Sequence, residues 1–88
     1  YSQAHTYCGL GVVAEDLQEY QQAKAHYQKS LELYAEFGDE YNGEIVLRNF
    51  PRLYQTTQDE GILTAVAQGL NTTVKEVRQR FANLNGDG

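Results

Sequence analysis

Residues 4–37 decide the fold that this sequence predicts, and they read AHTYCGLGVVAEDLQEYQQAKAHYQKSLELYAEF. Apolar side chains recur there in steps of three and four, which is the spacing of one face of an α-helix. The first such face comprises Tyr7, Leu10, Ala14 and Leu17. After a short break at Gln18 and Glu19, the second face comprises Ala23, Tyr27, Ser30, Leu31, Tyr34 and Phe37. The stretch therefore predicts two helices in succession.

The residues that flank these faces are typical of helix boundaries. Ser2 is a candidate N-cap of the first helix, because its hydroxyl can accept a hydrogen bond from a free backbone N–H. Gly38 suits the left-handed position just past a helix C-terminus, and Asp39 can cap the helix that follows. We therefore expect a second helix that ends close to Gly38 and a third that begins after Asp39.

A third apolar face lies 40 residues after the first and comprises Leu47, Phe50, Leu53 and Tyr54. The starts of the two stretches also correspond, because Tyr41 and Asn42 match Tyr1 and Ser2 at the same offset. Self-similarity at a fixed period indicates a structural repeat. We therefore interpret this stretch as a second, degenerate copy of the first.

Pro51 lies within this third face and leaves two interpretations open. A proline in the interior of a helix removes one hydrogen bond and kinks the helix. Alternatively, Asn49 caps a new helix, and Pro51 lies in the first turn of that helix. The sequence does not choose between a kink and a break.

The last third of the chain predicts two short helices. Asp59 or Glu60 opens the first, which runs to about Gln68 and stops at Gly69. The segment from Thr73 to Glu76 has the form of a capping box, so the final helix should start there. Its apolar side comprises Val74, Val77, Phe81 and Leu84.

Charge and composition exclude several classes of partner. The chain of 88 residues has a net charge of -5, with ten acidic and four basic residues before residue 61. Binding to nucleic acid or electrostatic attraction to a membrane needs a basic patch, and the sequence has none of any size. No apolar run is long enough for a membrane helix, and no signal peptide is visible. We therefore expect a cytoplasmic protein with neither nucleic acid nor membrane as a partner.

Residues 4–37 resemble a tetratricopeptide repeat, which is a helix–turn–helix with a sparse apolar signature. The matching positions are Tyr7, Leu10, Gly11, Leu17, Tyr20, Ala23, Tyr27 and Ser30, together with the string from Tyr27 to Leu33. Small side chains at Gly11, Ala23 and Ser30 allow two helices to approach closely, while Tyr7 and Tyr27 fill the remaining volume.

This resemblance implies an all-α fold, made of the antiparallel helix pairs of an α-solenoid with two short capping helices at the C-terminal end. We expect a helix pair at 1–38, a degenerate repeat helix at 39–58, a helical cap at 59–84 and a frayed tail at 85–88. Ala14 and Ala35 depart from the usual tyrosine and proline of the family, and the period is 40 residues. The loop Phe37-Gly38-Asp39 resembles those of the long-helix members. Because the chain begins at Tyr1 and contains no methionine, we expect a piece of a longer protein.

The resemblance also implies a binding groove lined by the first helix of each repeat, with a protein or peptide as partner. The groove positions in the first copy are His5, Cys8, Gly9, Val12, Glu15 and Asp16. Those in the second are Ile45, Arg48, Asn49, Arg52, Gln55 and Thr56. Arg48, Asn49 and Arg52 share one helix face, and two guanidinium groups with an amide suit a carboxylate of a partner. The alternatives are a solvated polar face, or an internal ion pair across the groove with Glu15 or Asp16.

The sequence gives little indication of metal binding or catalysis. His5 and Cys8 share a helix face, but a metal site needs more ligands, and a Cys–His nucleophile needs a third group to orient it. We therefore expect no enzyme activity, no metal site and no cofactor. Residues Ala67, Asn71 and Val77 imitate the spacing of a DNA-reading helix-turn-helix, which leaves a DNA-binding or regulatory tail as the alternative function.

The predicted fold leaves one apolar surface without a cover. Repeat proteins bury their core by stacking, and terminal repeats need a polar outer face. Here the N-terminal side of the first helix, with Tyr7, Val12 and Val13, would stay exposed. We therefore expect this chain to self-associate as a homo-oligomer.

Overall fold

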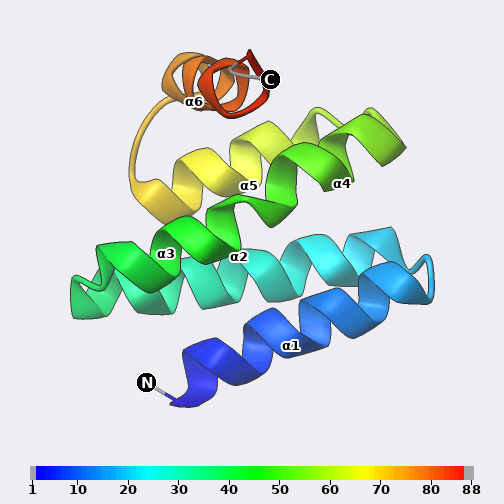
Figure 1. The fold of residues 1–88 in the computed structure, drawn as a ribbon, viewed down its shortest axis with the longest axis vertical. Helices are drawn as coiled ribbons and strands as arrows, with labels where there is room; N and C mark the ends of the chain where they lie inside the picture. The colour runs from blue at the N-terminus through cyan, green and yellow to red at the C-terminus, as the bar shows by residue number, and fades with distance from the viewer. Residues whose placement is uncertain (1, 87–88) are drawn as a thin grey trace.

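The computed structural model describes residues 2–86, which form a bundle of helices joined by short turns (Figure 1). In chain order the helices are α1 (Ser2–Asp16), α2 (Tyr20–Phe37), α3 (Glu40–Leu47), α4 (Asn49–Thr57), α5 (Gly61–Leu70) and α6 (Val74–Gly86). No β-strand occurs among these described residues. The predicted all-α class is therefore confirmed.

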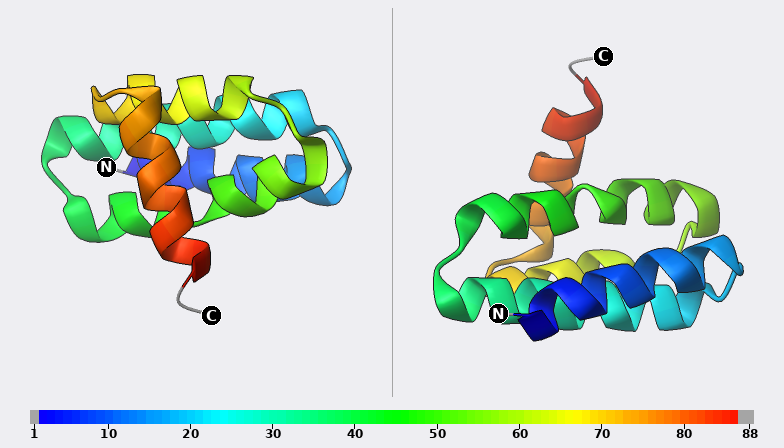
Figure 2. Two further views of the ribbon diagram at one scale, coloured as in Figure 1. Left: turned by 90° about the horizontal axis from the view of Figure 1, so that it is seen from above. Right: turned by 60° about the horizontal axis from the view of Figure 1, so that its bottom comes forward.

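Helix α2 lies at the centre of the bundle, where it contacts α1, α3, α4 and α5. Helices α1 and α3–α4 run in one direction, and α2 and α5 run in the other (Figure 1). Helix α6 crosses over one end of the bundle and packs on α4 and α5, while α1 lies at the opposite end (Figure 2). The chain thus has a covered end formed by α6 and a second end formed by α1.

Close packing of α1 on α2 depends on small side chains. A Cβ atom added to Gly11 would lie 2.6 Å from the ring of Tyr27, so only glycine leaves room for this fully buried tyrosine. The buried hydroxyl of Ser30 donates a 2.7 Å hydrogen bond to the carbonyl of Ala4. These contacts agree with the role predicted for Gly11, Tyr27 and Ser30.

The residues of the predicted apolar faces are not all buried. Ala14, Tyr27, Leu31 and Tyr34 are buried. However, Leu10 and Leu17 of α1 and Phe37 of α2 are exposed. The face of α1 that meets α2 is the one with small residues, Ala4, Gly11 and Ala14, because two long helices in close contact leave no room for leucine between them. Leu10, Leu17 and Phe37 therefore belong to the predicted apolar faces but lie at their exposed edges.

Left-handed residues end most of the helices. Gly38 follows α2 with φ of 69°, as predicted, and the Asp39 carboxylate then accepts a hydrogen bond from the backbone N–H of Asn42. Gln18 and Asn71 take the same conformation without being glycine, at φ of 62° and 55°. Gly69, predicted as the stop of α5, lies inside that helix. Its Cβ position is 2.9 Å from the side chain of Leu31, so this glycine serves packing against α2 rather than termination.

The helix breaks near Pro51 rather than kinking there. Helix α3 ends at Leu47, α4 begins at Asn49, and the buried Pro51 occupies the first turn of α4, where its missing N–H costs no hydrogen bond. The amide of Asn49 donates to the carbonyls of Ile45 and Val46, so it satisfies the end of α3 instead of capping α4. The second of the two interpretations is confirmed for the break, but not for the cap.

The two C-terminal helices start where the sequence places them. The Asp59 carboxylate accepts from the backbone N–H of Gly61 at the start of α5. The Thr73 hydroxyl accepts from the N–H of Glu76 at the start of α6. Val77 and Phe81 of α6 are buried, as predicted for its apolar side. The side chain of Leu84 and residues 87–88 of the predicted tail lie outside the described part, and α6 extends to Gly86.

Candidate binding surface

Three of the predicted groove residues meet at a point where α1 approaches α4. The guanidinium of Arg52 donates from Nε to Oε2 of Glu15 at 2.7 Å and from Nη2 to Oε1 at 2.8 Å. The same Nη2 donates to the side-chain oxygen of Asn49 at 2.7 Å. From the core side, the hydroxyl of Tyr27 donates to Glu15 at 2.7 Å. Glu15 thus joins three helices, α1, α2 and α4.

This network is the internal ion pair that the sequence left as one of the two alternatives to a carboxylate site. The side chain of Glu15 is only 14% exposed, whereas that of Arg52 is 55% exposed. Hydrogen bonds from Arg52 and Tyr27 lower the pKa of Glu15 below its ordinary value, against the opposing effect of burial. Burial, together with the bond to Glu15, raises the pKa of Tyr27. Both oxygens of Glu15 are engaged, so Arg52 already serves a carboxylate of the chain itself, and Asn49 contacts that network only by accepting from Arg52.

The other predicted groove residues remain at the surface. His5, Val12 and Arg48 are exposed, and Arg48 forms no ion pair with any residue in the described part of the chain. Val12 is 42% exposed, and Ile45 of α3 is 45% exposed. This part of the predicted groove therefore offers aliphatic side chains and one available guanidinium.

Helix α1 carries an exposed aliphatic surface that includes two residues of its predicted apolar face, Leu10 and Leu17. Leu10, Val13 and Leu17 follow the spacing of one helix face and are 43%, 55% and 65% exposed. From Ser2 to Ala14 the helix contains no Asp, Glu, Lys or Arg. The signal that could have placed these residues outside is the run of small residues at Ala4, Gly11 and Ala14, which marks the opposite face as the tightly packed one.

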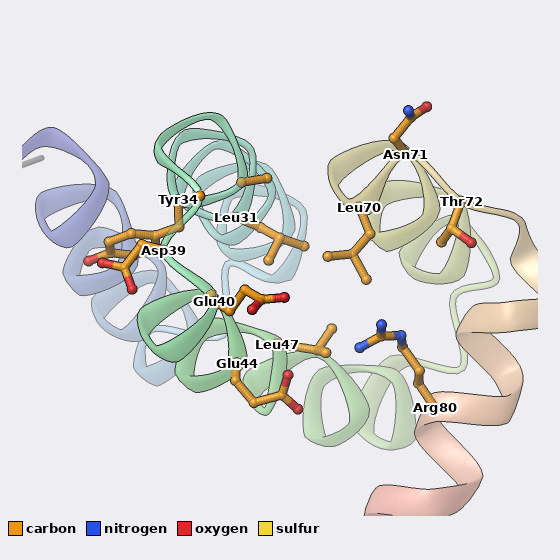
Figure 3. A pocket seen from close by; sticks show the side chains of 13 residues that line it. Leu31, Tyr34, Asp39, Glu40, Glu44, Leu47, Leu70, Asn71, Thr72 and Arg80 are labelled. Atoms are coloured by element: carbon orange, nitrogen blue, oxygen red, sulfur yellow. The ribbon is translucent and has the colours of Figure 1, made fainter.

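A hollow of about 570 Å³ lies between the end of α2, α3 and the junction of α5 with α6. Its aliphatic lining comes from Leu31, Leu47 and Leu70, and charged side chains reach it from α3 and α6 (Figure 3). A second, shallower hollow of about 230 Å³ lies where α6 meets α4, beside Tyr54 and Phe81. Of the residues of the predicted groove, Gln55 lines the smaller hollow and none lines the larger one.

Within residues 2–86, no three side chains of His, Cys, Asp or Glu are placed to hold a metal ion. Burial raises the pKa of the Cys8 thiol, which makes the nucleophilic thiolate scarcer at neutral pH. In the same part of the chain, no helix combines the length and apolar character that crossing a membrane requires.

Comparison of the chain with protein families, with curated proteins and with solved structures gave no match. The arguments for function therefore come from the surface itself.

Proposed function

We propose that this chain is a non-catalytic protein–protein interaction module that binds a peptide or helix of a partner protein. The exposed aliphatic surface of α1 carries this proposal. Leu10, Val12, Val13 and Leu17 are all more than two-fifths exposed on one helix that is free of acidic and basic side chains as far as Ala14. Exposed apolar surface of this kind is typical of sites where another protein docks.

The groove side of α1 gives the partner a defined chemistry. Val12 and Ile45 supply aliphatic contacts, and Arg48 is available for an acidic group of the partner. The Arg52–Glu15 pair links α1 and α4 at a fixed separation. Because Arg52 is already bonded to Glu15, it is not available to bind a ligand. We therefore favour a partner segment with aliphatic residues and an acidic group. We expect Arg48, rather than Arg52, to bind that acidic group.

We also propose a solenoid of the tetratricopeptide type as the architecture, in a cytoplasmic setting. Support comes from the glycine at position 11 beneath Tyr27 and from the way α2 packs on both α1 and α3. In addition, α5 packs on α2 in the same direction as α2 and 40 residues after it, where a second repeat would place its second helix.

The direct test is binding to an array of peptides that includes amphipathic helices and free acidic C-termini. We expect Val12→Asp to abolish most of the binding and Arg48→Glu to weaken it for acidic peptides only. Lys75→Glu is the matched control, because Lys75 is exposed on α6 and lies in no proposed site. Loss of binding with Lys75→Glu but not with Val12→Asp would contradict the groove assignment.

The outer side of α1 predicts association of the chain with itself. Leu10, Val13 and Leu17 form an uncharged stripe, so two copies can pack antiparallel without bringing like charges together. Sedimentation at tens of micromolar should show dimers or larger species, and Val13→Asp should give monomer. Monomer alone for the unmodified chain, with a cooperative melt, would contradict self-association.

A DNA-binding tail is the second candidate, and the geometry of α5 and α6 is the observation behind it. Ala67 and Val77 are buried and Asn71 is left-handed, as the short turn of a helix-turn-helix requires. However, Arg78 on α6 is paired with Glu60. Titration with duplex DNA at two salt concentrations separates the candidates, because phosphate contacts make the affinity fall steeply with salt.

A further inference from the structure

The larger hollow combines an aliphatic interior with charges of both signs. Leu31 of α2, Leu47 of α3 and Leu70 of α5 point into it (Figure 3). Glu40 and Glu44 lie on one face of α3, one helical turn apart, and Arg80 reaches in from α6 on the other side of the leucines (Figure 3). At about 570 Å³ the hollow has the size of a site for a small ligand.

These three charged side chains have no ionic partner in the described part of the chain. The ion pairs found there are Lys24–Asp59, Arg52–Glu15 and Arg78–Glu60. They occupy two of the four arginines of the sequence, and of the other two only Arg80 lines this hollow. Asp39, on the same rim, is already engaged by Asn42.

We propose that this hollow is a second binding site, separate from the groove, for a short peptide with a free ammonium and a free carboxylate at its two ends. The carboxylate pairs with Arg80 through charge-assisted hydrogen bonds, and the ammonium lies against Glu40 and Glu44. An aliphatic side chain between the two ends packs on Leu70, the partly exposed leucine of the lining. The two ends of the ligand thus supply counter-charges to Arg80 on one side of the hollow and to Glu40 and Glu44 on the other.

The arrangement disfavours simpler ligands. A purely apolar molecule would bring the three charged groups out of water without a partner, which costs free energy. A simple anion could pair with Arg80 but would face two carboxylates, and a simple cation would face the guanidinium. A molecule with both charges around an apolar centre gives a counter-charge to Glu40, Glu44 and Arg80 alike.

The test is a titration of the isotopically labelled chain with the tripeptide alanyl-leucyl-alanine, followed by NMR. We expect weak, saturable binding, with a Kd of about 1 mM, and shifts at the amides of Gly43 and Asn71. The C-terminal amide of the peptide should bind about fivefold more weakly, and so should its N-acetyl form.

Variants then assign the two charges. Arg80→Gln should weaken binding of the free acid about fivefold and should make the chain indifferent to C-terminal amidation. Glu44→Gln should reduce the effect of N-acetylation in the same manner. Lys75→Gln is the matched control, because this exposed lysine of α6 lies neither in the hollow nor in the groove, and it should bind like the unmodified chain.

Three results would overturn the proposal. They are the absence of saturable shifts up to about 10 mM peptide, equal affinity for the free acid and the amide, or an amidation effect that persists in Arg80→Gln. None of them affects the proposed groove, because Val12, Arg48 and Ile45 lie outside the hollow.

Discussion

The two ends of the bundle are built from similar helices but differ in what covers them. At one end, α6 lays Val77 and Phe81 onto α4 and α5, and these side chains are 0% and 6% exposed. At the other end, α1 presents Val13 and Leu17, which are 55% and 65% exposed. Both helices have apolar residues at helical spacing. The comparison shows that spacing identifies an apolar face, whereas the neighbouring helix decides whether that face becomes core or docking surface.

The largest effect should come from opening the covered end. Phe81→Ala removes a buried ring that packs beside Tyr54, with 6.3 Å between the two ring centres. Truncation of a buried phenylalanine costs about 3–5 kcal/mol, because it leaves a cavity as well as losing burial. We expect thermal and denaturant melts to show a loss of unfolding free energy near the lower end of this range, because α6 lies at the end of the bundle.

The matching change at the open end is Leu17→Ala. Its side chain is 65% exposed, so the free energy of unfolding should change by less than about 0.5 kcal/mol. The comparison must be made at a concentration where the chain is monomeric. If Leu17→Ala then lowered the free energy of unfolding as much as Phe81→Ala, the two ends would not differ in how tightly they are packed. A cost that appears only at high concentration would instead support self-association through α1.

A smaller effect separates the two faces of α1 itself. Gly11→Ala places a methyl group 2.6 Å from the Tyr27 ring, whereas Gly9→Ala places one in open space. Overpacking costs about 1–3 kcal/mol and opposes a gain in helix propensity of about 1 kcal/mol. We therefore expect Gly11→Ala to destabilise the fold and Gly9→Ala to stabilise it by about 0.5–1 kcal/mol. Equal stabilisation by both in chemical denaturation would show that Tyr27 is not tightly packed.

Local signals in the sequence predicted most helix boundaries correctly. Gly38, Asp39 and Thr73 act as expected, because each controls backbone groups within a few residues of itself. Left-handed Gln18 and Asn71 were missed, since neither residue type requires that conformation. The same limit applied to Gly69, which looked like a stop and instead makes room for Leu31 on another helix.

Contacts between helices were harder to predict than the boundaries of the helices themselves. The sequence allowed Arg52 to bind a foreign carboxylate or to pair with Glu15, and only the approach of α4 to α1 selects the second. The exposure of Leu10 and Leu17 was missed for the same reason. The hollow at Arg80 carries no sequence signature, because its residues come from α2, α3, α5 and α6.

The smallest expected effect concerns the ion pairs at the two ends, Arg52–Glu15 and Arg78–Glu60. Glu15 is 14% exposed and ties α1 to α4, while Glu60 is 61% exposed and pairs with Arg78 of α6. The pKa of Glu15 is lowered in the fold, chiefly by the hydrogen bonds from Arg52. A lowered pKa means that the charged form contributes stability above the ordinary pKa of the group, and this contribution is lost as the pH falls through the lowered value.

Glu15→Gln should therefore destabilise the chain at pH 7 by about 0.5–1.5 kcal/mol, and the difference from the unmodified chain should shrink below about pH 5. Glu60→Gln is the control, and its effect should stay small at every pH because exposed pairs contribute little. Thermal melts of both variants between pH 3 and pH 7 provide the measurement. A difference for Glu15→Gln that stays constant across this range would mean that the charge of Glu15 is not what holds α1 to α4. The open end would then owe its attachment to the packing of Gly11 and Ala14 alone.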